Sequence, residues 1–364
     1  NLKTRYGESK IPEVDIIDMK DEKYFGSQKE ISESLAKEMK INFKNKKQSI
    51  IFLNRRGFST FAKCIECGEV VMCPHCSVAL NYHKDNNKLM CHYCGYFMNL
   101  SSDCPKCHSK KICYMGFGTQ KIENILAEIL PGAKILRIDA DAKKSYKSIE
   151  KDLKDFSLGE YDVLVGTQMI AKGFNFPNVT LVGIVSIDSY LYGSDYKSYE
   201  KTFSLLTQVI GRAGRGIYPG KAMIQTFSPE EEIITMASNQ DYESFFDSEI
   251  NLRKSLLYPP FSDICVLSFS GVSEDKVINF SNNFFGNLKN IAREHYSDLP
   301  LRILPPTPAT VKKVSSKYRY KIIIKCKNNK KFRKMISAIL KDKSIMKSSL
   351  GVKIGVDINP EKIL

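Results

Sequence analysis

The sequence predicts an α/β fold in which a doubly wound domain is interrupted by a cysteine-rich insertion and followed by a small α+β domain. Three observations lead to this prediction. Apolar strand candidates alternate with amphipathic helix candidates from about residue 28 to residue 228. Eight of the 11 cysteines interrupt that alternation within one stretch, about 63–111. Strand and helix candidates resume beyond Pro259 and Pro260.

The α/β alternation begins with an amphipathic segment at 28–44. Ile31, Leu35 and Met39 share one face there, at the spacing of a helix. The apolar run that follows, 49–53, is typical of a strand buried in a parallel sheet. Further strands are expected at 134–138, 161–166, 180–187 and 222–227, and helices at 119–130, 148–157 and 199–213.

The region after residue 228 has a different order of elements. A mostly helical connection is expected at 229–257. Strands are then expected at 264–270, 320–326 and 352–358, with helices near 274–294 and 330–341 between them. This pattern predicts a small α+β domain.

Composition excludes several classes of protein. The 43% apolar content supports globular cores, and no stretch approaches about 20 uninterrupted apolar residues, so we expect no membrane span. Residues 1–15 lack the apolar core of a signal peptide, and the chain does not begin with Met. We therefore expect a cytoplasmic protein and a chain that begins within a longer one.

The net charge is +15, and much of the excess is clustered. Between Lys312 and Lys347, fourteen basic residues accompany one acidic residue, Asp342. Such a run can be a solvated face of the protein. A polyanion partner is the better interpretation, because clustered cations gain affinity by displacing counterions from phosphates.

Eight cysteines form four C-x-x-C pairs within 44 residues. The pairs are Cys64 with Cys67, Cys73 with Cys76, Cys91 with Cys94, and Cys104 with Cys107. Each pair can direct two thiolates at one metal ion, and two pairs complete the tetrahedron that zinc prefers. Four pairs therefore predict two structural Zn²⁺ ions, although an iron–sulfur or redox role is an alternative. Spacing alone leaves consecutive, nested and cross-braced pairing open.

A string of eight residues, 208–215, ends the helix expected at 199–213 and carries Gln208, Gly211, Arg212 and Arg215. Arg212 and Arg215 are three residues apart, so they are expected to project from the same helix face. In motors driven by nucleoside triphosphates, an arginine from one lobe reaches the γ-phosphate bound on the other and stabilises the charge that develops during transfer. The alternative is a helix end whose arginines face water.

An upstream segment, 163–173, runs from a strand into a polar turn that contains Thr167 and Gln168. These two residues follow the carboxyl end of the strand, where α/β sheets bind ligands. Their hydroxyl, amide and backbone N–H groups suit a nucleic-acid phosphate. An ordinary β–α turn would have the same appearance.

Together these motifs resemble the helicase family of primosomal protein N′ (PriA). The resemblance covers nearly the whole chain and includes, besides the cysteine pairs, the segments 52–57, 116–119, 166–169, 172–173, 208–215, 258–261 and 356–360. It implies a RecA-like second helicase lobe interrupted by a double Cys₄ zinc insertion. It also implies an ATP-dependent 3′→5′ DNA helicase that binds replication forks and starts primosome assembly, with primosome proteins and single-strand-binding protein as partners.

The resemblance also implies roles for individual residues. Gln208, Arg212 and Arg215 are implied in catalysis, and Gly173 and Gly211 in binding ATP with Mg²⁺. Thr119, Thr167, Gln168 and Lys172 are implied in DNA binding. Nested pairing is implied for the cysteines. Cys64, Cys67, Cys104 and Cys107 would hold one zinc ion, and Cys73, Cys76, Cys91 and Cys94 the other.

The domain organisation follows from the same comparison. We expect a leader at 1–27 from the first motor lobe, a second lobe at 28–62 and 112–228, the insertion at 63–111, a helical connection at 229–257 and the last domain at 258–364. The 364 residues contain no G-x-x-x-x-G-K-[ST] loop, so the chain alone is expected not to hydrolyse ATP. The alternative is a stand-alone zinc-ribbon module that binds nucleic acid.

Overall fold

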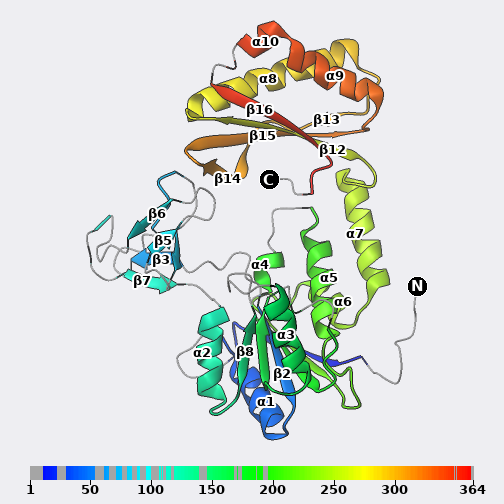
Figure 1. The fold of residues 1–364 in the computed structure, drawn as a ribbon. Helices are drawn as coiled ribbons and strands as arrows, with labels where there is room; N and C mark the ends of the chain where they lie inside the picture. The colour runs from blue at the N-terminus through cyan, green and yellow to red at the C-terminus, as the bar shows by residue number, and fades with distance from the viewer. Residues whose placement is uncertain are drawn as a thin grey trace. The chain divides into compact units, whose positions relative to one another are not determined.

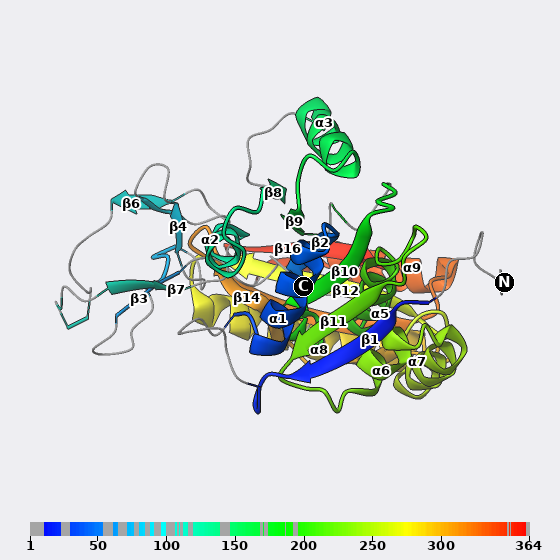
Figure 2. The same ribbon diagram turned by 90° about the horizontal axis from the view of Figure 1, so that it is seen from below.

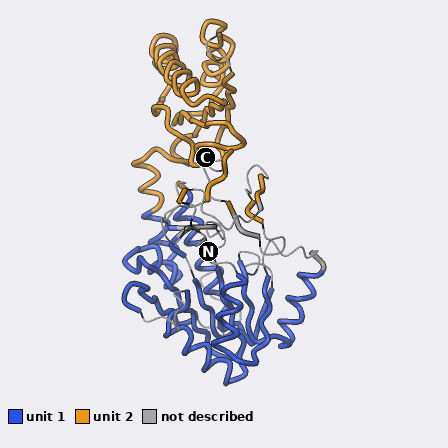
Figure 3. Tube along the Cα trace, turned by 90° about the vertical axis from the view of Figure 1, so that its left-hand side faces the viewer, with its two compact units in different colours: residues 1–59, 116–193, 197–248 blue, residues 60–115, 194–196, 249–364 orange. Residues whose placement is uncertain are grey.

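A computed structural model of the chain shows two compact units (Figure 3). Unit 1 comprises residues 1–59, 116–193 and 197–248, and unit 2 comprises 60–115, 194–196 and 249–364. The structure describes residues 11–22, 30–53, 61–64, 71–75, 80–83, 88–90, 96–99, 106–107, 109, 112–115, 119–138, 146–167, 170, 174–185, 187–191, 196–347, 349 and 351–361.

Unit 1 is built on a six-stranded parallel sheet with the order β1-β11-β10-β2-β9-β8 (Figure 1). The strands are β1 Glu13–Asp18, β2 Gln48–Leu53, β8 Ile135–Ile138, β9 Val163–Gly166, β10 Val179–Val185 and β11 Lys221–Thr226. Five of them lie at the positions that the sequence predicts. β1 was not predicted: it falls in the expected leader and pairs with β11 along its whole length (Figure 2).

Helices cover both faces of this sheet, which confirms the doubly wound fold. They are α1 Glu33–Lys44, α2 Thr119–Ile129, α3 Tyr146–Ser157, α4 Asp188–Leu191, α5 Ser198–Ile210 and α6 Glu232–Ser238. In β2, Ile50 and Phe52 join the core under α3, α5 and α6, whereas Ile51 and Leu53 join the core under α1 and α2. Every residue of β2 is buried, as expected of a central parallel strand.

Unit 2 contains two further sheets, of which the first belongs to the cysteine-rich insertion. Its order is β6-β5-β4-β3-β7, with β3 Phe61–Cys64, β4 Asn81–His83, β5 Lys88–Met90, β6 Phe97–Asn99 and β7 Ile112–Met115. Among the described side chains of the insertion, Val71, Leu80 and Leu89 are buried.

The second sheet of unit 2 forms the last domain, in the order β13-β15-β12-β16 with β14 paired to β15. Its strands are β12 Asp263–Gly271, β13 Arg302–Ile303, β14 Thr307–Val314, β15 Lys317–Cys326 and β16 Val352–Ile358. The helices α8 Glu274–His295, α9 Lys330–Lys341 and α10 Lys343–Lys347 lie on one face of the sheet (Figure 1). The helix α7, Tyr242–Leu256, precedes this domain. The predicted α+β class is confirmed, and none of the described helices is long and apolar enough to cross a bilayer.

Candidate functional site

The arginine motif begins where α5 ends. Helix α5 ends at Ile210, three residues earlier than the sequence predicts, and Gly211 is its C-cap. Backbone N–H groups of Arg212 and Ala213 still donate to the carbonyls of Val209 and Ile210, so the chain makes one tighter turn after the helix. The two arginines therefore project from a turn rather than from a helix face.

The two arginines have different surroundings. Arg212 is 7% exposed, and its Nη1 donates a hydrogen bond to the backbone carbonyl of Phe174. Burial, and then the positive charge of Arg215, lower the pKa of Arg212 to about 10, so it stays protonated at neutral pH. Arg215 is exposed and its Nε donates to the Gly211 carbonyl at 2.7 Å. Only Arg215 has the exposure that a residue reaching across to another lobe needs.

Close backbone packing holds this turn against the segment before β10. The Gly214 N–H donates to the Val179 carbonyl at 3.0 Å, and Gly214 has a φ of +67° that favours glycine. A Cβ on Gly216 would stand 2.3 Å from the Pro177 carbonyl oxygen. Val179 is the first residue of β10, so the arginine turn lies at the amino end of the sheet.

Gln208 lies on α5, one turn before Arg212. Its Nε2 donates to the Ser204 hydroxyl at 3.0 Å, a contact within the helix at its surface. Gly173, predicted to bind ATP, and Lys172, predicted to bind DNA, lie outside the described residues. They directly precede Phe174 in the sequence, and the Arg212–Phe174 hydrogen bond places Phe174 beside the arginine turn.

Two of the predicted DNA-binding residues, Thr119 and Thr167, lie at the other end of the sheet. Thr167 follows the carboxyl end of β9, and Thr119 is the first residue of α2. Near that helix end, Arg137 on β8 donates to Gln120, which places the start of α2 by the carboxyl ends of the strands. Thr119 and Thr167 are 5% and 7% exposed, and Gln168 lies outside the described residues. Their contact with DNA stays a prediction.

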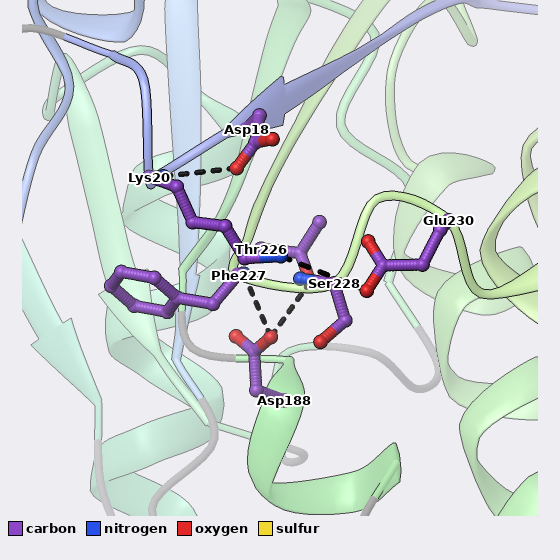
Figure 4. A network of polar contacts seen from close by, with 7 residues as sticks. All are labelled: Asp18, Lys20, Asp188, Thr226, Phe227, Ser228 and Glu230. Atoms are coloured by element: carbon purple, nitrogen blue, oxygen red, sulfur yellow. Dashed lines mark hydrogen bonds and ion pairs between the residues drawn. The ribbon is translucent and has the colours of Figure 1, made fainter.

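Asp188 is a residue of this edge that the sequence did not single out. It is the first residue of α4, just after β10, and its Oδ1 accepts from the Thr226 hydroxyl at 2.7 Å and from the Phe227 N–H at 2.8 Å (Figure 4). The Ser228 N–H donates in turn to the Thr226 hydroxyl at 3.0 Å. This network ties the segment after β10 to the end of β11. In the sequence, Asp188 follows a strand that is expected to be buried. That position could have marked it as a candidate residue at the carboxyl edge of the sheet.

Two strand pairs of the insertion are relevant to which cysteine pairs share a zinc ion. In the antiparallel pair β3–β7, Cys64 lies opposite Ile112. The first cysteine pair thus begins where β3 ends, and the fourth pair precedes β7 in the sequence. In the hairpin β4–β5, Asn81 lies opposite Met90. The second pair precedes β4, and the third follows β5.

In the sequence, the first and fourth cysteine pairs thus flank the β3–β7 strand pair on its inner side, and the second and third pairs flank the β4–β5 hairpin on its outer side. Cys73 is buried and Cys107 is exposed. The side chains of Cys64, Cys67, Cys76, Cys91, Cys94 and Cys104 lie outside the described residues, so the ligand sets stay a prediction.

Comparison with known proteins identifies the three parts of the chain. The model for the Primosomal protein N C-terminal domain matches residues 254–361, that for the PriA DNA helicase Cys-rich region matches 73–98, and that for the Helicase conserved C-terminal domain matches 105–216. The chain is 36% identical over 367 residues to the replication restart protein PriA of Bacillus subtilis. This alignment covers 99% of the chain and 44% of that relative.

The chain belongs to the PriA family. The PriA of Borreliella burgdorferi is 37% identical over 365 residues, with 100% of this chain and 53% of that protein covered. The chain thus spans about half the length of the curated relatives it matches. The resemblance drawn from the sequence is confirmed, as is the helicase lobe with its cysteine-rich insertion and PriA C-terminal domain.

Solved structures were compared with the chain as well. The C-terminal domain of the DEAD-box protein Dbp5 gives a TM-score of 0.30 at 14% identity and covers 67% of this chain and 98% of that one. The helicase domain of Hef from Pyrococcus furiosus gives a TM-score of 0.26 at 16% identity and covers 56% of this chain and 28% of that one. The family assignment above depends on the sequence matches alone.

Proposed function

We propose that this chain supplies the second motor lobe, the zinc-binding insertion and the C-terminal domain of an ATP-dependent 3′→5′ DNA helicase that acts in replication restart. The observation that carries the proposal is the arginine turn. A buried Arg212 is tied to Phe174 just after Lys172 and Gly173, and an exposed Arg215 stands beside it. A stand-alone nucleic-acid-binding module, which does not hydrolyse ATP, would not require this arrangement of two arginines.

The arginines have separate tasks in this proposal. Arg215 reaches the triphosphate held on another lobe and stabilises the charge that develops in transfer. Arg212 fixes the turn and adds a second positive charge behind it. Gln208 and Gly211 of the string 208–215, and Gly173 of the upstream segment, are proposed for the same nucleotide site. When ATP and Mg²⁺ bind, the metal neutralises phosphate charge, and the residues of this chain complete a site that the chain cannot form alone.

DNA binding is proposed for the opposite end of the sheet and for the last domain. Thr119 and Thr167 lie at the carboxyl ends of the strands, and Gln168 directly follows Thr167 in the sequence. Lys172, which precedes Gly173, is proposed as a further DNA contact. This separation lets one lobe contact a nucleotide and a DNA strand at the same time. We propose primosome proteins and single-strand-binding protein as partners of the whole helicase.

We propose two structural zinc ions in the insertion. One is held by Cys64, Cys67, Cys104 and Cys107, and the other by Cys73, Cys76, Cys91 and Cys94. The strand registers Cys64 with Ile112 and Asn81 with Met90 support this pairing. With four thiolates on each ion, no ligand position is left for water, so the zinc stabilises the module rather than catalysing a reaction.

The experiment that tests the motor role compares the 364-residue chain with the full-length protein that contains it. The chain alone is expected to show no ATP hydrolysis above background, with or without DNA. The full-length protein is expected to show hydrolysis that single-stranded DNA stimulates. DNA-stimulated hydrolysis by the isolated chain would overturn the shared-site proposal, and its absence from the full-length protein would overturn the motor role itself.

A further inference from the structure

The last domain has a sheet face that its helices leave open. On β12, Cys265, Leu267 and Phe269 join the core under α8 and α9. Side chains alternate along a strand, so Ser268 and Ser270 point to the opposite face. At one half of that face, Ile264 and Val266 are buried in a small cluster with Tyr196 and Tyr258. The other half, around the two serines, is exposed or half-buried.

Cations surround these two serines. Arg319 on β15 lies opposite Ser270, and Ser270 lies opposite Lys353 on β16. One row further along, Lys321 lies opposite Ser268. Directly opposite residues share a face, so all three cations stand on the same side as the serines.

Lys317 extends this row of cations along β15. It lies two residues before Arg319, which lies two before Lys321, so alternate positions place a cation about every 6.7 Å on one face. Among the described residues, Lys317, Arg319 and Lys353 form no ion pair, and the nearest carboxylate on this face by register is Asp357, opposite Val266. The open half is therefore strongly positive.

Gly355 keeps the centre of the row accessible. It lies opposite Ser268, and a Cβ there would stand 2.6 Å from the serine Oγ. Because glycine occupies this position, Ser268 remains exposed. A hydroxyl flanked by lysine and arginine is a common set of donors to a phosphate oxygen.

Three other cations of the basic run have partners elsewhere in the domain. Lys312 pairs with Glu274 at 2.5 Å, Lys331 pairs with Asp298 at 2.7 Å, and Lys325 donates to the Leu256 carbonyl. The run between Lys312 and Lys347 is thus divided by the fold, and Lys317, Arg319 and Lys321 of β15 form a continuous row on the open half of the sheet face.

We propose that the open half of the β12–β15–β16 sheet face binds the phosphate backbone of a DNA strand, with Lys317, Arg319, Lys321 and Lys353 as the phosphate-binding cations and Ser270 as a hydroxyl donor. The proposal rests on the proposed function, because it assigns a second DNA contact to the same helicase. A straight row of evenly spaced cations matches a polymer whose charges repeat evenly, which favours a nucleic-acid strand over an acidic protein.

The test measures the affinity of the 364-residue chain for a fluorescent single-stranded oligonucleotide at several salt concentrations. The sheet-face variant carries Lys317→Ala, Arg319→Ala and Lys353→Ala. Its matched control carries Lys330→Ala, Lys334→Ala and Lys341→Ala on the exposed side of α9, and both lose three positive charges. The sheet-face variant is expected to reduce the salt slope by about 2 to 3, and the control by less than about 1.

The outcomes separate the two proposals. If the unmodified chain does not bind DNA, the proposed function of this part fails. If it binds and the two triple variants behave alike, the sheet face is not the contact. If the two triple variants behave alike, DNA binding by the chain still stands, and the sheet face is expected to bind a different ligand. Ser270→Asp is a second variant, which places a carboxylate between Arg319 and Lys353 and is expected to weaken binding without shortening a basic side chain.

Discussion

The buried guanidinium of Arg212 donates a hydrogen bond to the backbone carbonyl of Phe174, the residue that directly follows Lys172 and Gly173. Two segments that the sequence picked out separately therefore meet at one point of the lobe. Arg212 is held there by burial, and Arg215 remains exposed beside it. This division suggests that the two arginines respond differently to substitution.

The first prediction concerns Arg215. In the full-length protein, Arg215→Ala is expected to lower DNA-stimulated ATP turnover by about 10³-fold or more, because an arginine finger stabilises the transition state. The affinity for ATP is expected to change much less. Steady-state turnover and nucleotide binding measure the two quantities. The control is Arg293→Ala, which changes an exposed arginine on α8. Normal ATP turnover by the Arg215→Ala protein would show that Arg215 does not act as an arginine finger.

The second prediction uses the lowered pKa of Arg212. Burial lowers that pKa to about 10, so the wild-type arginine stays charged up to pH 9. The same burial would lower the pKa of a lysine at this position below its ordinary value of about 10.4. Arg212→Lys in the full-length protein is therefore expected to lose turnover at a lower pH than the wild type, because its cation deprotonates first. A parallel pH profile for wild type and variant would show that the charge at 212 is not used.

The sequence predicted the interior of this fold better than its edges. β2 and β10 are buried throughout and mostly apolar, and they were found within one or two residues, because a central parallel strand must be buried on both faces. β1 and β14 were missed, since these edge strands carry Asp, Glu, Lys, Thr and Pro, which resemble loop composition. Pairing with a neighbouring strand, rather than their own composition, makes them strands.

The same limit applies to the candidate site. The spacing of Arg212 and Arg215 indicated one shared helix face, but α5 ends at Ile210 and the two side chains differ in burial. Burial of Arg212 depends on Phe174, which comes from a segment 38 residues away. A contact of this kind follows from tertiary packing and has no local signature. Asp188 was missed for the same reason, because its partners lie on β11 and just beyond it.

The third prediction concerns zinc. Elemental analysis of the purified chain is expected to give two zinc ions. Cys64→Ser and Cys104→Ser are each expected to lose one ion, and the double variant is expected to lose no more than either single variant, because both residues serve the same site. Cys64→Ser combined with Cys73→Ser is expected to lose both ions. Loss of only one ion by this second double variant would contradict nested pairing.

The fourth prediction concerns Asp188. Asp188→Ala leaves the Phe227 N–H and the Thr226 hydroxyl without their acceptor. Loss of a charged acceptor from two donors is expected to cost about 1–3 kcal/mol, seen as a lower midpoint for unfolding of unit 1. Asp188→Asn keeps an oxygen acceptor and is expected to cost less. Asp247→Ala on the exposed side of α7 is the control. If Asp188→Ala, Asp188→Asn and Asp247→Ala changed the unfolding midpoint equally, the Asp188 network would not stabilise this edge of the sheet.

The last prediction tests whether close backbone packing positions the arginine turn. A Cβ on Gly216 would meet the Pro177 carbonyl oxygen at 2.3 Å, and a backbone atom cannot move away as a flexible side chain can. Gly216→Ala is therefore expected to displace the turn that carries Arg215 and to lower DNA-stimulated ATP turnover in the full-length protein by about 10²-fold, because small misplacements of a catalytic group are costly.

Gly286→Ala is the matched control for this substitution. Gly286 lies inside α8, and a Cβ there would meet nothing within 4 Å. Alanine is the better helix former by about 1 kcal/mol, so this variant is expected to be slightly more stable and to keep its turnover. If Gly216→Ala retained full turnover with a wild-type unfolding midpoint, the turn would have room to shift, and the contact with Pro177 would not be what places Arg215. If the turnover of Gly216→Ala fell while its unfolding midpoint stayed within a few degrees of wild type, the loss would come from displacement of Arg215 and not from unfolding.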